Sequence, residues 1–375
     1  MKTWVLDGIC FAVLCVLLTL GLWPFHTPMN EVTWLGSRNG LRLGEFSSVI
    51  SSTAFPMTSA DEGASGSIEV WLQPRRIWDS STILAFCAPG NPPQFSLRQA
   101  QVDLELRTGI LDDLHPANTR SLYVDNALRK PGPVFVTITS GIRGTAVYTD
   151  GVLSRTAPQF RLPARAFTSR LVLGDSPGQT DSWSGQLLGL AIYRRELTAA
   201  QILRHYETWT QGGQPHVSED ESNAALYLFN ERAGSVVHNR ARSGVDLYIP
   251  EKYEVLDKIF LEQFWKEFNM SQSYWESALK NIVGFIPFGF CVFPCLSAHK
   301  LKHAALATVI LGTLVSLTIE VLQAYLPTRD SGTTDLFTNT LGTYIGVVAF
   351  RVVSPILATK FSWLTLVNWS RGASR

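Results

Sequence analysis

The stretch "IEVLQAYLPTRDSGTTDLFTNTLGTYIG", residues 319–346, joins two apolar segments through a polar connection. The flanking segments, residues 304–325 and 336–357, are each long enough to cross the apolar core of a bilayer, which needs about 20 residues. Hydrogen-bonding and ionisable side chains nevertheless stand at and inside their ends: Glu320, Gln323, Arg329, Asp330, Asp335 and Asn339. Because such groups are costly when they face lipid, we expect them to point into a helix bundle.

Helical spacing supports this expectation. Ser316, Glu320 and Gln323 follow one another at i, i+4 and i+7, which places them on one helix face. A second shared face carries Asp335, Asn339, Gly342 and Gly346. The last two form a G-x-x-x-G pair, which allows two helix backbones to approach closely.

Two further apolar segments, residues 4–23 and 281–296, bring the number of expected spans to four. Lys300 and Lys302 lie between the second and third spans, and basic residues prefer the cytoplasmic side of short loops. This predicts cytoplasmic N- and C-termini, an extracytoplasmic segment 25–275 and a cytoplasmic tail at 359–375. The polar groups named above, together with Asn281, then lie near the outer face. A signal peptide is the alternative for the first segment, but the run ends in "WPFHTP" without small residues for cleavage.

Residues 36–250 are polar and rich in short β patterns. "GSIEVWLQP", "PVFVTITS", "GTAVYTDGVLSRT", "SRLVLGD" and "WSGQLLGLAIYRREL" predict strands, with a hairpin turn at Asp150-Gly151. "TAAQILRHYETW" then predicts a helix capped by Thr198. Many short strands with regular turns indicate an all-β sandwich or jelly roll.

The same motifs, in this order over about residues 40–210, resemble laminin-G-like, concanavalin A-like jelly-roll domains. Residues 224–250 resemble a strand pair of such a domain, which either completes this sandwich or remains from a second one. The resemblance implies binding of a glycan or a protein, in some relatives through calcium. Asp175 and Asp181 are the calcium candidates, and no other cofactor is expected. Trp78 and Trp183 are candidates for stacking on sugar rings, with burial in the sandwich as the alternative.

Residues 251–280 join the β domain to the second span. Ile259, Phe260, Phe264 and Phe268 recur at roughly helical spacing. We expect an amphipathic helix along the outer membrane surface, or alternatively a helix packed on the jelly roll.

Three separated stretches resemble the VanZ-like family of bacterial envelope proteins. They are "LLTLGLWPFHTPMNEVTWL", "NIVGFIPFGF" and "SLTIEVLQAYLPTRDSGTTDLFTNTLGTYIG". The family part then covers residues 1–35 and 281–358, with the β domain inserted between the first and second spans. The fold expected is therefore mixed: a four-span helical bundle and an extracytoplasmic all-β jelly roll. The resemblance implies an inner-membrane location and a role near envelope glycans, and it supplies no reaction.

Three functions remain open. The first is a non-enzymatic envelope protein whose jelly roll binds a glycan or protein while the bundle engages membrane lipid or a lipid-linked component. The second is a membrane enzyme that uses Glu320 and Asp335 as acid/base groups and Arg329 as an anion clamp. The third is a structural subunit of a larger complex. In the first two, the headgroup site comprises Asn281, Glu320, Gln323, Arg329, Asp330, Asp335 and Asn339. A purely structural polar network is the alternative, and Asp335 is also a candidate helix cap.

Composition narrows these functions. The formal net charge of +1 and the lack of a basic block give no reason to expect a nucleic-acid partner. The five cysteines have neither disulfide-framework nor zinc-finger spacing, and no hydrolase triad order or phosphate-cradling glycine loop appears. A non-enzymatic role is the simpler interpretation, and the oligomeric state is not encoded in any visible pattern.

Overall fold

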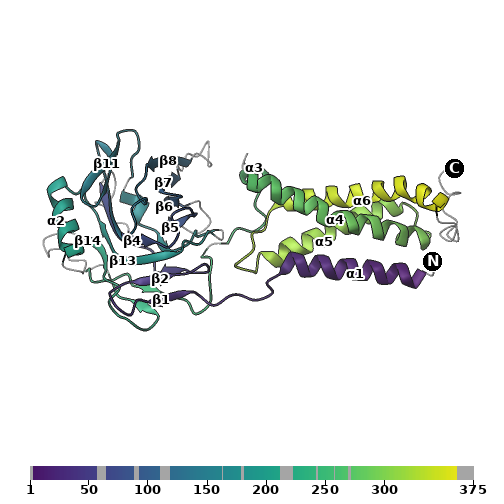
Figure 1. The fold of residues 1–375 in the computed structure, drawn as a ribbon, viewed down its shortest axis with the longest axis horizontal. Helices are drawn as coiled ribbons and strands as arrows, with labels where there is room; N and C mark the ends of the chain where they lie inside the picture. The colour runs from purple at the N-terminus through teal and green to yellow at the C-terminus, as the bar shows by residue number, and fades with distance from the viewer. Residues whose placement is uncertain are drawn as a thin grey trace. The chain divides into compact units, whose positions relative to one another are not determined.

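The fold is described from a computed structural model (Figure 1). It describes residues 3–56, 65–87, 93–109, 119–162, 164–178, 181–211, 223–241, 244–256, 258–268 and 272–360. The chain divides into two compact units. One consists of Met1–His26 and Ile259–Arg375, and the other of Thr27–Lys258. Each unit has a hydrophobic core of its own.

Unit Thr27–Lys258 is a sandwich of two antiparallel sheets. The first sheet has the order β1 (Val32–Trp34), β2 (Leu41–Leu43), β13 (Gly185–Tyr193), β4 (Gly66–Pro74), β9 (Val134–Gly141), β10 (Gly144–Thr149) and β11 (Val152–Ala157), and β14 (Asn223–Tyr227) also pairs with β13. The second sheet has the order β15 (Val236–Val237), β16 (Leu247–Tyr248), β3 (Val49–Ser51), β12 (Arg170–Leu173), β5 (Ser80–Cys87), β6 (Phe95–Ala100), β7 (Asp103–Gly109) and β8 (Thr119–Val124). A 3-10 turn, η2 (Ala164–Phe167), precedes β12. This architecture confirms the expected all-β sandwich.

The core lies between the sheets because apolar residues alternate along the strands. In β4, Ile68, Val70 and Leu72 are buried in the core, while Glu69 lies on the opposite face. The two-residue β10–β11 turn has positive φ at Asp150 (52°) and Gly151 (75°), as a type I′ turn requires. Both features agree with the strand and turn signals in the sequence.

Helix α2 (Ala199–Gln211) covers the outer face of the first sheet (Figure 1). Its N-terminus is a capping box, in which Thr198 Oγ1 accepts the Gln201 backbone N–H and Gln201 Oε1 accepts that of Thr198. Beneath the helix the fully buried Glu69 carboxylate contacts His205 Nδ1 at 3.0 Å and accepts the Tyr193 hydroxyl at 2.7 Å. A buried carboxylate with these partners joins the helix to β4 and β13.

Residues 223–248 complete this sandwich rather than belonging to a second one. Strand β14 pairs with β13 in the first sheet, and β16 pairs with β3 in the second. The Tyr227 hydroxyl donates to the Val245 carbonyl at 2.6 Å, which links the two additions. Of the two alternatives for residues 224–250, completion of the same sandwich is therefore correct.

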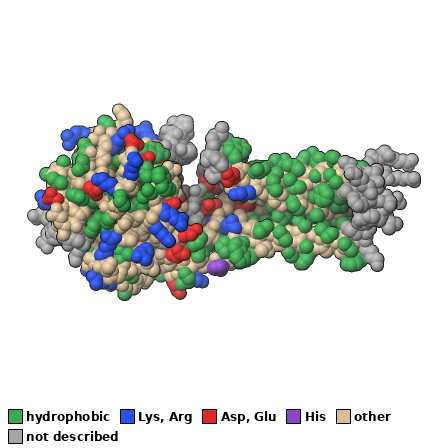
Figure 2. All heavy atoms as spheres, viewed as in Figure 1, with side chains coloured by type: hydrophobic (Ala, Val, Ile, Leu, Met, Phe, Trp, Pro, Cys, Tyr) green, Lys and Arg blue, Asp and Glu red, His purple; other side chains and the backbone are tan. Residues whose placement is uncertain are grey.

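The other unit is helical: α1 (Thr3–Leu22), α3 (Phe264–Glu267), α4 (Gln272–Ala298), α5 (Ala304–Gln323) and α6 (Thr333–Lys360). Within the described chain, four helical segments are long and apolar enough to cross a membrane: Trp4–Leu22, Tyr274–Ala298, Ala304–Gln323 and Thr333–Pro355. Figure 2 shows hydrophobic side chains over much of the visible helical surface. Phe11, Leu314 and Val352 are among the exposed hydrophobic residues of these helices. Such apolar surface suits lipid and not water.

One expectation for this unit was wrong. Residues 251–280 do not form a single amphipathic helix: α3 is one short turn, and α4 begins at Gln272. The cause is a tertiary contact, because the Glu262 N–H donates to Ser331 O at 2.9 Å and its carbonyl accepts the Thr333 N–H at 2.8 Å. Strand-like bonding of Glu262 prevents helix hydrogen bonds there, although Phe264 and Phe268 remain exposed.

Helices α4 and α6 approach closely along Gly342 and Gly346. A Cβ atom built on Gly342 would lie closer than 3.0 Å to the Ile282 carbonyl, and one on Gly346 would crowd the Ile286 carbonyl and the Phe290 nitrogen in the same way. The glycines therefore set the distance between these two backbones.

Replacing Gly346 with valine should force α4 and α6 apart, at a cost of about 1–3 kcal/mol. Unfolding of the full chain in detergent micelles measures this as a lower transition midpoint. Gly284→Val is the matched control, because a Cβ at Gly284 of α4 meets nothing within 4 Å. Equal midpoints for the two variants would contradict the packing described.

Candidate functional site

The first candidate site is built on the buried face of α5. Ser316, Glu320 and Gln323 are all buried there, with Glu320 only 1% exposed. Asn339 of α6 is also buried, and its Nδ2 donates to Ser316 Oγ at 2.9 Å. Ser316 lies about one helical turn before Glu320 on the same face of α5. These polar groups lie inside the bundle.

Glu320 holds the connection between α5 and α6. Its Oε2 accepts the backbone N–H of Gly332 at 2.9 Å, and its backbone carbonyl accepts the Ser331 hydroxyl at 2.9 Å. Both partners lie eleven or twelve residues further along the chain. One residue near the end of α5 therefore fixes the last part of the connection that leads into α6.

Gln323 and Arg329 hold the C-terminal end of α1. Gln323 Nε2 donates to the Gly21 carbonyl at 2.8 Å, and Arg329 Nε donates to the Trp23 carbonyl at 2.8 Å, with the Arg329 NH2 group donating to the same oxygen. Carbonyls in the last turn of a helix have no partner within the helix. The two side chains supply donors that the end of α1 lacks.

We call this arrangement the loop-end network. It consists of Gly21, Trp23, Glu262, Glu320, Gln323, Arg329, Ser331, Gly332 and Thr333. Three other predicted site residues, Asp330, Asp335 and Asn281, are not members of this network as defined here. Asp330 is exposed in the α5–α6 connection, Asp335 lies in the first turn of α6, and Asn281 is half-buried on α4.

The geometry of this network is that of a structural joint. Arg329, the predicted anion clamp, donates to the carbonyl of Trp23, the residue after α1, and Glu320 accepts a backbone N–H. At 1% exposure Glu320 is withdrawn from any solvent-borne substrate in this conformation. The network can therefore hold helix ends and the segment around Glu262 together.

The second candidate site is the outer face of the second sheet. Leu97, Leu104, Leu106 and Leu122 belong to the core, so the residues alternating with them point outward. Strand register places Arg98, Glu105 and Tyr123 side by side, and Ser96, Arg107 and Ser121 in the next row. We call these six residues the β6–β8 face.

Glu105 organises the β6–β8 face from a nearly buried position, with its side chain 3% exposed. Its Oε1 accepts from Arg107 Nε at 2.6 Å, from the Tyr123 hydroxyl at 2.8 Å and from Ser121 Oγ at 2.9 Å. Arg98 lies 3.6 Å away from the other oxygen and pairs with Asp181. The carboxylate thereby fixes an exposed tyrosine ring and a half-exposed guanidinium.

These contacts shift the pKa values of Glu105 and Tyr123. Burial raises the pKa of Glu105, but the hydrogen bonds from Arg107, Tyr123 and Ser121 outweigh it, so its pKa lies below the ordinary 4.5. The hydrogen bond to Glu105 also raises the pKa of Tyr123 above 10.0. The face therefore keeps a carboxylate, a guanidinium cation and a neutral phenol across the neutral range.

The calcium candidates do not fit a calcium site. Asp175 is fully buried, its Oδ1 accepts the N–H groups of Ser176 and Asp181 at 2.8 Å each, and its Oδ2 accepts the Tyr253 hydroxyl. Asp181 accepts the Thr82 hydroxyl at 2.6 Å and pairs with Arg98. A calcium ion needs six to eight oxygen ligands, and here it would meet N–H donors and a guanidinium.

Of the two tryptophans that were candidates for sugar stacking, one is buried and the other is exposed. Trp183 is fully buried, and its indole N–H donates to Gln99 Oε1 at 2.7 Å, so it belongs to the core. Trp78 is 69% exposed in the turn between β4 and β5 and is available to a ligand.

Sequence reasoning missed the β6–β8 face and the contribution of Glu262. The alternation Leu104-Glu105-Leu106-Arg107 is a signal for the former, since it places two opposite charges on the outer side of one strand. No sequence signal points to Glu262, because the partners of its backbone groups, the Ser331 carbonyl and the N–H and hydroxyl of Thr333, lie about seventy residues away.

Comparison with known proteins agrees with both parts of this description. Residues 225–354 match the VanZ/LLP1 family, and residues 47–203 match the concanavalin A-like lectin/glucanases superfamily. The chain therefore combines a VanZ-like membrane region with a laminin-G-like domain, which confirms both resemblances. The VanZ match begins within β14 and so includes the last strands of the sandwich. No curated protein matches the chain.

Several solved structures match part of the chain at low similarity. A putative carbohydrate binding protein from Bacteroides ovatus is 12% identical, covers 62% of this chain and 61% of its own, and has a TM-score of 0.38. A heptameric SAP-like pentraxin from Limulus polyphemus is 14% identical, with coverages of 60% and 93% and a TM-score of 0.35. HCR/D-Sa-GBL1/C is 16% identical with a TM-score of 0.37, and the match covers 48% of this chain but only 45% of that structure. At these TM-scores none of them carries an argument about ligands.

Replacing Glu320 with alanine should destabilise the helical unit, because the buried Gly332 N–H loses its acceptor. The expected cost is about 1–3 kcal/mol. Denaturant titration of the full chain in mixed micelles measures it. Thr318→Ala is the control, since Thr318 is exposed on α5 and its hydroxyl donates to the Leu314 carbonyl of the same helix. An unfolding free energy for Glu320→Ala equal to that of the control would contradict the structural role.

The stability of the sandwich should fall as the pH rises from about 4 to about 7 through Asp175. Burial raises the pKa of Asp175 from 3.8 to about 7, so the folded chain holds this proton where the unfolded chain has lost it. The stabilisation is fully present below 3.8 and is lost as the pH rises through about 7. The thermal midpoint of the sandwich should show this slope in the parent protein, and Asp175→Asn should flatten it. A parallel slope in both proteins would show that another group titrates.

Proposed function

We propose that this chain is a non-enzymatic protein of the bacterial envelope whose β6–β8 face recognises a glycan. The observation that carries the proposal is the pairing of the exposed Tyr123 ring with the half-exposed Arg107 on one buried carboxylate, Glu105. An aromatic ring offers a flat apolar surface with a polar edge, as a sugar ring does. A guanidinium carries five N–H donors, and Arg107 uses its Nε on Glu105, so other donors serve hydroxyl or carboxylate groups of a sugar.

Preorganisation favours this face over other exposed parts of the sandwich. Tyr123 and Arg107 are held by hydrogen bonds before a ligand arrives, so binding costs less side-chain entropy. Strand β11 of the other sheet is also exposed along most of its length, but there the Ser154 hydroxyl contacts the Thr149 hydroxyl of β10 at 2.5 Å rather than a buried carboxylate. The superfamily match of residues 47–203 supports a glycan as the ligand class.

In this proposal the helical unit anchors the protein in the membrane, and its apolar outer surface contacts membrane lipid. The donors of Gln323 and Arg329 serve the helix ends, which favours a structural use of these groups over headgroup capture or catalysis. The VanZ/LLP1 match and the four apolar helices support the envelope location. With the sandwich outside the cell, the β6–β8 face meets surface glycans.

The test is binding of the full chain, in lipid nanodiscs, to an array of bacterial surface and cell-wall glycans. We expect binding that Tyr123→Ala weakens about tenfold, equal to about 1.4 kcal/mol. Tyr123→Phe should keep most of the affinity, because it preserves the ring. Arg107→Ala should weaken binding to a similar extent.

Matched controls lie on β11 of the other sheet. Leu153→Ala and Arg155→Ala remove an exposed apolar and an exposed basic side chain there, and neither should change glycan binding. Absence of binding to every glycan on the array, or equal losses in the β11 controls, would contradict the proposal.

A further inference from the structure

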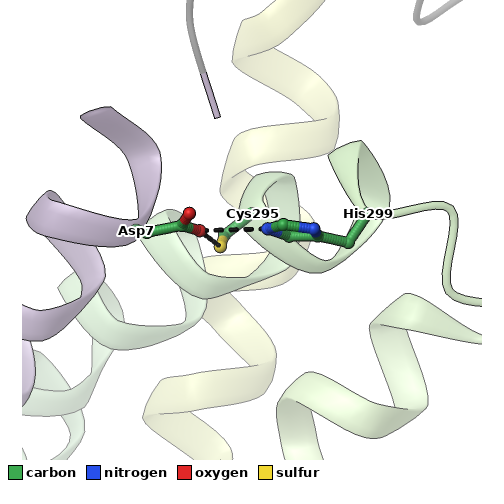
Figure 3. Close-up of side chains that lie close together, drawn as sticks. All are labelled: Asp7, Cys295 and His299. Atoms are coloured by element: carbon green, nitrogen blue, oxygen red, sulfur yellow. Dashed lines mark hydrogen bonds and ion pairs between the residues drawn. The ribbon is translucent and has the colours of Figure 1, made fainter. Parts of the chain in front are cut away.

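A second group of polar side chains lies between α1 and α4, far along both helices from the loop-end network. Asp7 of α1, Cys295 of α4 and His299 in the turn after α4 point toward one another (Figure 3). Asp7 Oδ1 accepts the Cys295 thiol at 3.1 Å and lies 3.1 Å from His299 Nε2. The three candidate ligand atoms lie within 4.8 Å of one another. This is a convergence of three different donor types from two elements.

The need for Asp7 is not explained by helix packing. Leu17, Phe285 and Phe288 already form an apolar contact between α1 and α4, with Cys10 and Val13 beside it. Asp7 is the charged residue within the span Trp4–Leu22. An ionisable residue in a membrane span is costly and is usually retained for a function.

The donor set has the chemistry of a transition-metal site. A thiolate, an imidazole and a carboxylate are the three side-chain ligands of Zn²⁺, with metal–ligand distances of about 2.0–2.3 Å. Tetrahedral geometry at these lengths separates neighbouring ligand atoms by roughly 3.3–3.6 Å. The observed 3.1 Å contacts need only a small expansion to admit an ion. Cys295 lies in the last turn of α4, and the His299 N–H donates to the Cys295 carbonyl at 3.2 Å, which keeps the two residues together at the end of this helix.

The geometry points to a binding site for a divalent transition metal of the zinc class, formed by Asp7, Cys295 and His299. Binding replaces the two hydrogen bonds by three metal–ligand bonds, and the Cys295 thiol proton leaves to solvent. Asp7 and His299 have side chains 48% and 53% exposed, which gives the ion an entry path, while Cys295 is buried. The fourth position is open to water.

A metal here has a clear physical consequence. It bonds α1 to α4 at the end remote from the loop-end network, so the first helix is held at both ends. The predicted topology places this end at the cytoplasmic side, where thiols are kept reduced and are available as ligands. The site does not depend on glycan recognition by the sandwich.

The test uses the full chain, without a metal-affinity tag, purified in detergent, stripped of metal and titrated with Zn²⁺ or Co²⁺. We expect one equivalent of zinc by elemental analysis, a higher thermal midpoint with zinc, and thiolate-to-cobalt charge-transfer absorption with Co²⁺. Cys295→Ser should abolish that absorption. Asp7→Asn and His299→Gln should weaken Co²⁺ binding about tenfold or more, as expected for loss of one ligand.

Matched controls are present on the same elements. Cys15 is an exposed thiol on α1, and His303 is an exposed imidazole just before α5. Cys15→Ser and His303→Gln should bind metal as the parent does. A parent protein that binds less than one equivalent, or charge-transfer absorption that survives Cys295→Ser, would overturn the inference. Glycan binding by the same samples reports separately on the sandwich.

Discussion

The membrane unit depends on one constraint: a helix that ends within or beside lipid must find donors for its last carbonyl groups. Helix α1 ends at Leu22, and the carbonyls of Gly21 and Trp23 receive N–H groups from Gln323 and Arg329. Those donors in turn sit on α5 and on the connection that Glu320 holds through Gly332. Two of the polar groups that look out of place in an apolar sequence, on Gln323 and Arg329, are therefore the partners of backbone carbonyls at the end of another helix.

In the sandwich, too, buried polar side chains hydrogen-bond to groups of neighbouring elements and so hold these elements together. Glu69 is fully buried between the first sheet and α2, and its partners His205 and Tyr193 come from the helix and a neighbouring strand. Asp175 fixes the loop after β12 by accepting two backbone N–H groups. Glu105 differs because two of its partners, Arg107 and Tyr123, reach the surface. That difference is the reason to read Glu105 as the centre of a binding face and the other two carboxylates as joints.

Much of the fold follows from local patterns in the sequence. Strand β4, the Asp150-Gly151 turn and the capped helix α2 are predictable because alternation, turn chemistry and capping act over a few residues. The partners of Gln323 and Arg329 are not predictable in this way, since they lie 302 and 306 residues away. Around Glu262 the helical spacing of apolar residues predicted a continuous helix that does not form. The backbone of Glu262 instead hydrogen-bonds to Ser331 and Thr333. The polar site residues were thus visible in the sequence, whereas their role depends on contacts that only the tertiary structure supplies.

The central claim is that Arg329 serves the end of α1 and is not held ready for a ligand. Solid-state NMR on the full chain in lipid bilayers tests it directly, with a ¹³C label at the Trp23 carbonyl and ¹⁵N at Arg329 Nε. The account predicts a measurable ¹³C–¹⁵N dipolar coupling, because the 2.8 Å contact between that nitrogen and the carbonyl oxygen keeps the labelled carbon close to it. A coupling too weak to detect in ligand-free bilayers would contradict it, because the guanidinium would then lie away from the helix end.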